Sequence, residues 1–113
     1  MPPSVKPVPG HPPATVGPFP FSAEMWLYQG KGAWHFVTLP VEVGEEIRAR
    51  TAMNRRGWGS VRVSVTIGGS TWQTSIFPDK KTGSYLLPVK EDIRSAEHLH
   101  VGEQVDVRLD VFL

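Results

Sequence analysis

Alternating apolar and polar residues in two neighbouring segments constrain the fold of this chain more than any other feature. Between residues 60 and 67 every second side chain is apolar, namely Val61, Val63, Val65 and Ile67. Residues 70–77 alternate in the same way, and Gly68-Gly69 separates the two runs. A period of two predicts strands with one buried face, and a Gly-Gly pair between two such strands predicts a hairpin. We therefore expect a mainly β protein.

The rest of the chain after residue 18 fits the same class. A strand at 19–28 is expected to turn at 29–32 into a strand ending near 39, and residues 104–113 alternate again. Two short stretches break the period of two, around 42–50 and 89–96. Their apolar residues recur every three or four positions, and acidic residues precede basic ones, which favours short helices. The sequence thus predicts six strands and two short helices.

The motif Leu-Pro-Val occurs twice, each time between a strand and a helix. It stands at Leu39-Pro40-Val41 and at Leu87-Pro88-Val89, so the two prolines are 48 residues apart. We interpret the repeat as the mark of two related β-β-α halves in one small, closed barrel with pseudo-twofold symmetry. A chance match of so short a motif is the alternative. A closed barrel would also leave no free strand edges.

Proline divides the chain into two parts, because eight of the eleven prolines lie within residues 1–20. Proline fixes φ and has no backbone N–H. We therefore expect residues 1–18 to form an extended tail of the polyproline type, and residues 19–113 to form a single domain. The tail is interpreted as a linker. The alternative is a ligand for an SH3-type groove, since Pro9-Gly10-His11-Pro12 loosely fits a PxxP pattern.

Several motifs occur in a characteristic order along the body. They are Phe21-x-Ala23-x-x-Trp26, Trp34-x-Phe36-Val37-x-Leu39-Pro40, Gly57-Trp58-Gly59-x-Val61-x-Val63, Ile67-Gly68-Gly69-x-x-Trp72-x-Thr74-Ser75-Ile76-Phe77-Pro78, Gly83-x-Tyr85-x-Leu87-Pro88-Val89-Lys90 and Val101-Gly102-Glu103-x-Val105. Over roughly residues 19–110 the chain resembles the bacterial family catalogued as domain of unknown function 1905. The resemblance implies a small double-split β-barrel. Glu103 stands where the family usually has Asp, and the resemblance transfers no catalytic residue because the family has no established activity.

Composition excludes several classes of function. The chain has no cysteine, which excludes a disulfide framework and thiolate chemistry, and its formal net charge is +1. So small a charge argues against attraction of the whole surface to nucleic acid or anionic lipid. No apolar run reaches the roughly 20 residues of a membrane helix, and the tail lacks the pattern of a secretory signal. We expect a bacterial, cytoplasmic protein with no cofactor and no membrane partner.

Histidine and serine offer little support for catalysis or metal binding. His98-x-His100 could ligate a metal from a strand, but its place between a helix end and a turn favours solvated loop residues. His35 is expected to face outward from its strand. Ser75 could meet Asp106 and a histidine only through tertiary contact, and no glycine elbow surrounds it. We therefore predict no catalytic residue, no metal ligand and no enzyme activity.

The candidate functional surface is an arginine-rich segment around Trp58. Five arginines fall within fifteen residues, at Arg48, Arg50, Arg55, Arg56 and Arg62. Arginine binds phosphate and carboxylate as a fork, and an exposed tryptophan offers a stacking face. We predict a surface for an anionic ligand or nucleic acid at Arg55, Arg56, Trp58 and Arg62. The alternative is that Arg48 pairs with glutamates of its own helix while the loop arginines are solvated and Trp58, like most of the four tryptophans, packs in the core.

These observations favour a non-enzymatic binding or interaction module. The first alternative is a barrel that binds a small ligand, with or without weak enzymatic activity, in a pocket at its mouth lined by tryptophans and Tyr85. The second is a structural partner domain that docks on another protein, or on a second copy of itself, through the tail or a barrel face. A ligand-sized cavity with polar groups would favour the small-ligand barrel.

Overall fold

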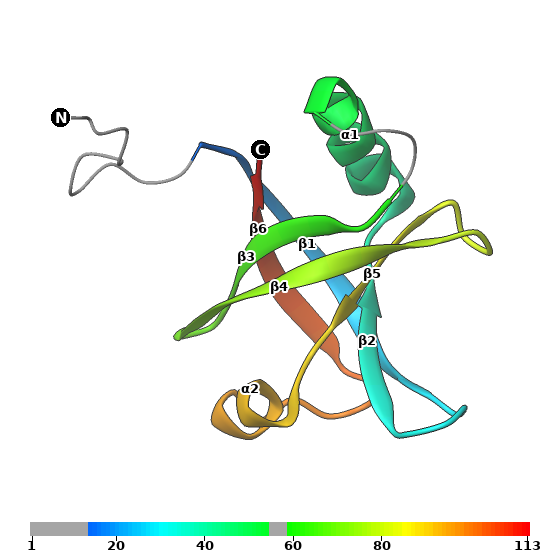
Figure 1. Ribbon diagram of the computed structural model, residues 1–113. Coiled ribbons are helices and arrows are strands. Elements are labelled where there is room, and N and C mark those ends of the chain that lie inside the picture. The colour runs from blue at the N-terminus through cyan, green and yellow to red at the C-terminus, as the bar shows by residue number, and fades with distance from the viewer. Residues whose placement is uncertain (1–13, 55–58) are drawn as a thin grey trace, which may run out of the picture.

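The structure, a computed structural model, describes residues 14–54 and 59–113. Within these ranges it contains six strands, two helices and one short 3-10 turn (Figure 1). In chain order they are β1 (Thr15–Tyr28), β2 (Trp34–Thr38), α1 (Val41–Thr51), η1 (Ala52–Asn54), β3 (Val61–Ile67), β4 (Ser70–Asp79), β5 (Ser84–Pro88), α2 (Glu91–Ala96) and β6 (Gln104–Phe112).

The strands form one closed antiparallel barrel in the order β1-β2-β5-β4-β3-β6, with β6 pairing back onto β1 (Figure 1). This cyclic order is unchanged when β1, β2 and β3 are exchanged with β4, β5 and β6. The connectivity therefore has the twofold relation that the repeated Leu-Pro-Val motif predicts, with α1 after β2 and α2 after β5. The predicted mainly β barrel with two short helices is confirmed.

The alternation in the sequence separates the inside of the barrel from the outside. On β3 the four apolar residues are buried while Arg62 is exposed, and β6 buries every second residue in the same way. Among the tryptophans that the structure describes, Trp72 lies in the core, whereas Trp26 and Trp34 are on the outer face of the barrel. The alternative in which most tryptophans pack in the core therefore does not hold for these two. The small interior is filled mainly by valine, leucine and isoleucine side chains, together with Phe19, Met25, Trp72 and Tyr85.

β1 begins inside the segment that the sequence analysis assigned to the tail. Thr15 pairs with Phe112 and Val16 with Val111, and after a register shift the pairing resumes at Phe19. The strand thus starts four residues before its predicted start. Proline cannot donate to a strand ladder and is tolerated at bulges. Strand pairing therefore continues past Pro18, which lies in the register shift, and includes Pro20. From the sequence, these prolines were interpreted as the end of the tail.

β4 and β5 pair over a short distance only. Residues 77–79 of β4 pair with residues 84–86 of β5, whereas β4 pairs with β3 along residues 70–76. Within the described chain, the other edge of β4 before Phe77 has no strand partner, so the barrel is split there. Glu97, directly after α2, accepts a hydrogen bond of 2.6 Å from Ser70 Oγ and one of 3.4 Å from the Gly69 N–H. These bonds hold α2 beside the β3–β4 turn, next to the split.

Candidate functional site

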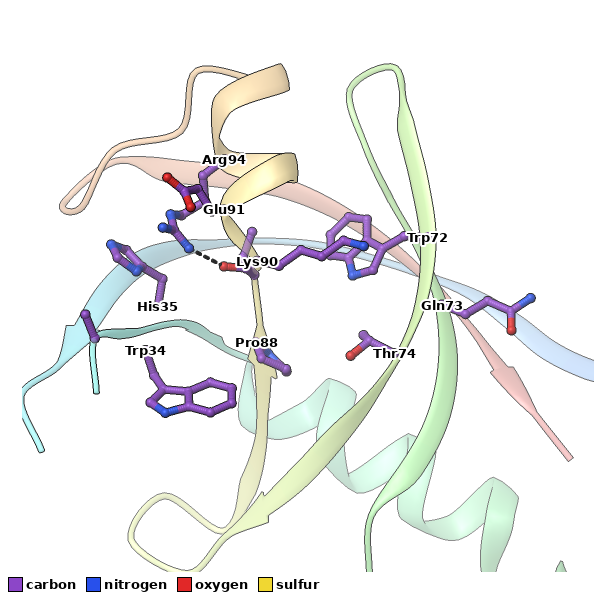
Figure 2. Close-up of a pocket in the computed structure, with 11 residues that line it drawn as sticks. Trp34, His35, Trp72, Gln73, Thr74, Pro88, Lys90, Glu91 and Arg94 are labelled. Atoms are coloured by element: carbon purple, nitrogen blue, oxygen red, sulfur yellow. Dashed lines mark hydrogen bonds between the residues drawn. The ribbon is translucent and has the colours of Figure 1, made fainter. Parts of the chain in front are cut away.

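A pocket of about 520 Å³ lies where β4 separates from β5 (Figure 2). Its walls are the start of β2, the first half of β4, and the connection from β5 into α2. The Val89 N–H donates a 2.9 Å hydrogen bond to the His35 carbonyl oxygen, which joins two of these walls. The pocket therefore gathers side chains from three segments that are far apart in the sequence.

Two cationic side chains reach this pocket from the β5–α2 connection, Lys90 and Arg94. Arg94 Nη1 donates a 2.8 Å hydrogen bond to the Val89 carbonyl oxygen, which holds the guanidinium group at the wall. Glu91 also lines the pocket, but within the described residues neither cation has an acidic partner at ion-pair distance. The formal charges of Lys90, Arg94 and Glu91 sum to +1. Neither cation was predicted as a site residue from the sequence, although both follow closely after the second Leu-Pro-Val motif.

His35 lies on the inner side of β2, not on the outer side as predicted. Val37 and Leu39 are buried in the core, and the period of two places His35 on the same face as these residues. Its neighbours Trp34 and Phe36 are large and apolar although they face outward. The alternation of apolar and polar residues therefore predicted the wrong face for His35. His35 Nδ1 is buried and has no hydrogen-bond partner among residues 14–54 and 59–113. A buried polar atom without a partner costs folding free energy.

Two tryptophans form the aromatic part of the pocket. Trp34 is 53% exposed and Trp72 only 9%, so one ring stands at the rim and the other lies in the core. Figure 2 shows the Lys90 side chain extending across the pocket toward Trp72, with Thr74 below them on the same wall as Trp72. The pocket thus combines flat apolar faces, a hydroxyl group and positive charge.

The surface predicted around Trp58 falls largely outside the described residues. Arg55, Arg56 and Trp58 belong to the undescribed segment 55–58. Arg62 is exposed on the outer face of β3, where its Nη1 donates a 3.3 Å hydrogen bond to Ser75 Oγ, and it does not line the pocket. The predicted anionic-ligand surface therefore stays a prediction.

The arginines of α1 have partners of their own. Arg50 forms an ion pair of 3.3 Å with Glu46 on the same helix. Arg48 Nη2 donates a 3.0 Å hydrogen bond to the Gly83 carbonyl oxygen. Both contacts hold these side chains against other residues of the fold, and neither arginine lines the pocket at the split.

Other residues considered from the sequence lie elsewhere. Tyr85, expected at the barrel mouth, is 1% exposed in the core and does not line the pocket. His98 and His100 are exposed after α2. In the part of the chain that the structure describes, no three histidine or carboxylate side chains gather as metal ligands, and no helix combines the length and apolar character needed to span a membrane.

Comparison with known protein families identifies the family of this chain. The model of one family, described as a domain of unknown function (DUF1905), matches residues 21–109. The match includes all three walls of the pocket. No curated protein matches the chain.

Proposed function

Because the chain belongs to the family described as domain of unknown function DUF1905, whose description names no activity, we propose a function from the pocket itself: the barrel binds a small organic anion that carries a planar ring. One observation supports this proposal above all. Lys90 and Arg94, neither with an acidic partner in the described residues, share one pocket with the rings of Trp34 and Trp72.

The charged end of the ligand is recognised by Lys90 and Arg94. The Arg94 guanidinium uses one N–H on the Val89 carbonyl oxygen, which leaves other N–H groups to bind a carboxylate or phosphate. Lys90 adds a second positive charge from the adjacent wall. Hydrogen bonds from charged donors are the stronger ones in proteins, and a half-enclosed pocket screens them less than bulk water does.

The planar end of the ligand is recognised by the tryptophan rings. Trp34, which is 53% exposed, offers an apolar face on which a ring can stack, and the buried Trp72 ring forms part of the wall. The Thr74 hydroxyl group offers a hydrogen bond to a polar ring substituent. The volume of about 520 Å³ lies within the range of about 300–1,000 Å³ that is usual for small-molecule sites. The pocket is thus large enough for a nucleotide or an aromatic acid.

The proposal is of binding without turnover, in a module of the bacterial cytoplasm. It keeps the non-enzymatic binding role that the sequence favoured, but assigns it to a tryptophan-lined pocket, as in the small-ligand alternative, and not to the segment around Trp58. Binding of nucleic acid at Arg55, Arg56, Trp58 and Arg62 is a separate hypothesis, and the experiment below does not depend on it.

Titration with matched pairs of charged and neutral compounds tests the proposal. AMP is compared with adenosine, and benzoate with benzamide, while tryptophan fluorescence reports occupancy of the pocket. We expect the anion of at least one pair to quench fluorescence saturably, and its neutral analogue to bind at least about tenfold more weakly, a difference of about 1.4 kcal/mol. Replacement of both cations, Lys90→Gln with Arg94→Gln, is expected to remove this preference for the anion.

Arg108→Gln is the matched control, because Arg108 is an exposed arginine on β6 outside the pocket. This variant loses one positive charge, as Lys90→Gln or Arg94→Gln does alone, and is expected to bind the anion like the unchanged chain. Equal affinity for AMP and adenosine and for benzoate and benzamide, or an equal loss of binding in the control, would contradict the proposal.

A further inference from the structure

A second concave surface, the aromatic groove, lies on the outer face of β1, β2, β5 and β4. It has a volume of about 360 Å³ and is lined by five apolar side chains, Tyr28, Trp34, Phe36, Phe77 and Leu86. Tyr28 is 48% exposed, Trp34 53% and Phe77 44%. Tyr28 pairs directly with Trp34, and Phe77 with Leu86, so strand pairing sets the spacing of the groove. An exposed apolar patch of this kind marks an interaction surface.

The rings of the groove stand as ridges. The Trp34 and Phe36 rings are nearly parallel, at 9° with centroids 6.1 Å apart, and the Tyr28 ring meets Phe36 edge-on at 74° and 6.4 Å. Aromatic ridges of this sort grip the rings of successive prolines in a polyproline helix. Of the residues that the structure describes, no charged one lines the groove, which distinguishes its ligand from the anion proposed for the pocket at the split.

Two hydrogen-bond donors at the groove have no partner among residues 14–54 and 59–113. Among the described residues, neither Tyr28 Oη nor Trp34 Nε1 makes a hydrogen bond, whereas Trp26 Nε1 donates to Thr38 Oγ1 at 2.8 Å. A polyproline helix has no internal hydrogen bonds, so its carbonyl oxygens are free to accept. The groove therefore offers both ring faces and donors to a proline-rich segment.

The chain itself carries such a segment. Six of residues 1–13 are proline, at Pro2, Pro3, Pro7, Pro9, Pro12 and Pro13. We propose that residues 1–13 of one copy dock in the aromatic groove of a second copy. This inference is independent of the anion site, with which the groove shares Trp34 alone among the described lining residues.

The place where the segment joins the barrel favours a second copy over the same chain. Ala14 accepts a hydrogen bond from the Leu113 N–H, so the segment joins at the end of β1 that lies beside the C-terminus (Figure 1). Tyr28 stands at the other end of β1, roughly 40 Å along the strand. A polyproline helix of 13 residues spans only about 40 Å. A segment docked in its own groove would thus be fully stretched along the barrel, whereas the segment of a neighbouring copy has no such constraint.

Light scattering over a range of concentrations, with a synthetic peptide of residues 1–13 as competitor, tests this inference. We expect the mass of the full chain to rise from 12.5 kDa toward twice that value as concentration increases. Added peptide is expected to reverse the rise and to shift the Trp34 indole N–H resonance, while a peptide with its prolines replaced by alanine does neither. Phe77→Ser with Tyr28→Ser, both exposed outside the anion pocket, is expected to keep the chain monomeric and to weaken peptide binding at least about tenfold.

Arg108→Gln, on β6 away from the groove, is expected to associate like the unchanged chain. A chain that stays monomeric at all concentrations would overturn the inference, even if the peptide binds. Association that persists in the Phe77→Ser, Tyr28→Ser variant would overturn it too, because the contact would then lie elsewhere. Anion binding measured with AMP and benzoate is read separately, since neither substituted residue lines that pocket.

Discussion

Alanine in place of Leu87 is expected to lower the free energy of unfolding by about 2–5 kcal/mol, the usual range for truncating a buried leucine. Leu87 is 0% exposed in the core. It stands on β5, which connects the two sides of the barrel through three residue pairs with β2 and three with β4. Because so few residue pairs hold β5 in place, we expect packing around Leu87 to contribute much of the stability of the closed barrel. Urea unfolding followed by tryptophan fluorescence measures the change in the midpoint.

Leu86→Ala is the matched control for this prediction. Leu86 is the adjacent residue on the same strand, but it points to the outer face and is only partly buried. Its truncation removes the same atoms and is expected to cost less than about 1 kcal/mol. Equal losses of stability in the two variants would contradict the assignment of inside and outside on β5.

Valine in place of Gly44 is expected to lower the free energy of unfolding by about 2–3 kcal/mol through overpacking. Gly44 is buried where α1 packs against β5. A Cβ at position 44 would overlap Ser84 Oγ and would lie 3.2 Å from Ser84 Cβ, and Ser84 is 0% exposed. Neither the helix nor the strand can yield without loosening the barrel, so the glycine is required by the close approach of the two elements.

A double-mutant cycle with Ser84→Ala measures this contact. Removal of the hydroxyl group opens space beside position 44, and Gly44→Val is then expected to cost about 1 kcal/mol less than in the unchanged chain. Gly59→Val is the control, because a Cβ at Gly59 would meet nothing within 4 Å; its effect is expected to stay within about 0.5 kcal/mol. Additive effects of Gly44→Val and Ser84→Ala would show that the two residues are not in contact.

Regular alternation explains why most strands could be predicted. In β3, β4 and β6 every inward side chain is apolar or small and most outward ones are polar, so the sequence reports burial directly. β2 has no such contrast, because Trp34 and Phe36 face outward with rings as apolar as the core residue Val37. The predicted orientation of His35 was therefore wrong, and the outward position of Trp34 and Phe36 in the groove was not predicted.

The start of β1 shows a second limit of sequence reasoning. Prolines at 18 and 20 suggested a tail that ends near residue 18, because proline removes a backbone donor. The structure pairs Pro20 with Arg108 and accommodates Pro18 at a register shift. Whether a proline ends a strand depends on whether the paired strand needs a hydrogen bond from an N–H at that position. The residue paired with Pro20 is Arg108, which is 88 positions further along the chain.

The sequence by itself determined the class of fold, the two halves and the boundaries of the central strands, because these depend on local periodicity and on the chemistry of glycine and proline. Only the tertiary structure decided where the candidate sites are. The pocket joins His35, Trp72 and Lys90 through the split between β4 and β5, and the aromatic groove joins Tyr28 and Phe77 across four strands. The physical reason is that strand register, a long-range property of paired backbones, determines which side chains become neighbours. The prolines of residues 1–13 are a local feature of the sequence. Their proposed binding site, the aromatic groove, is visible only in the tertiary structure.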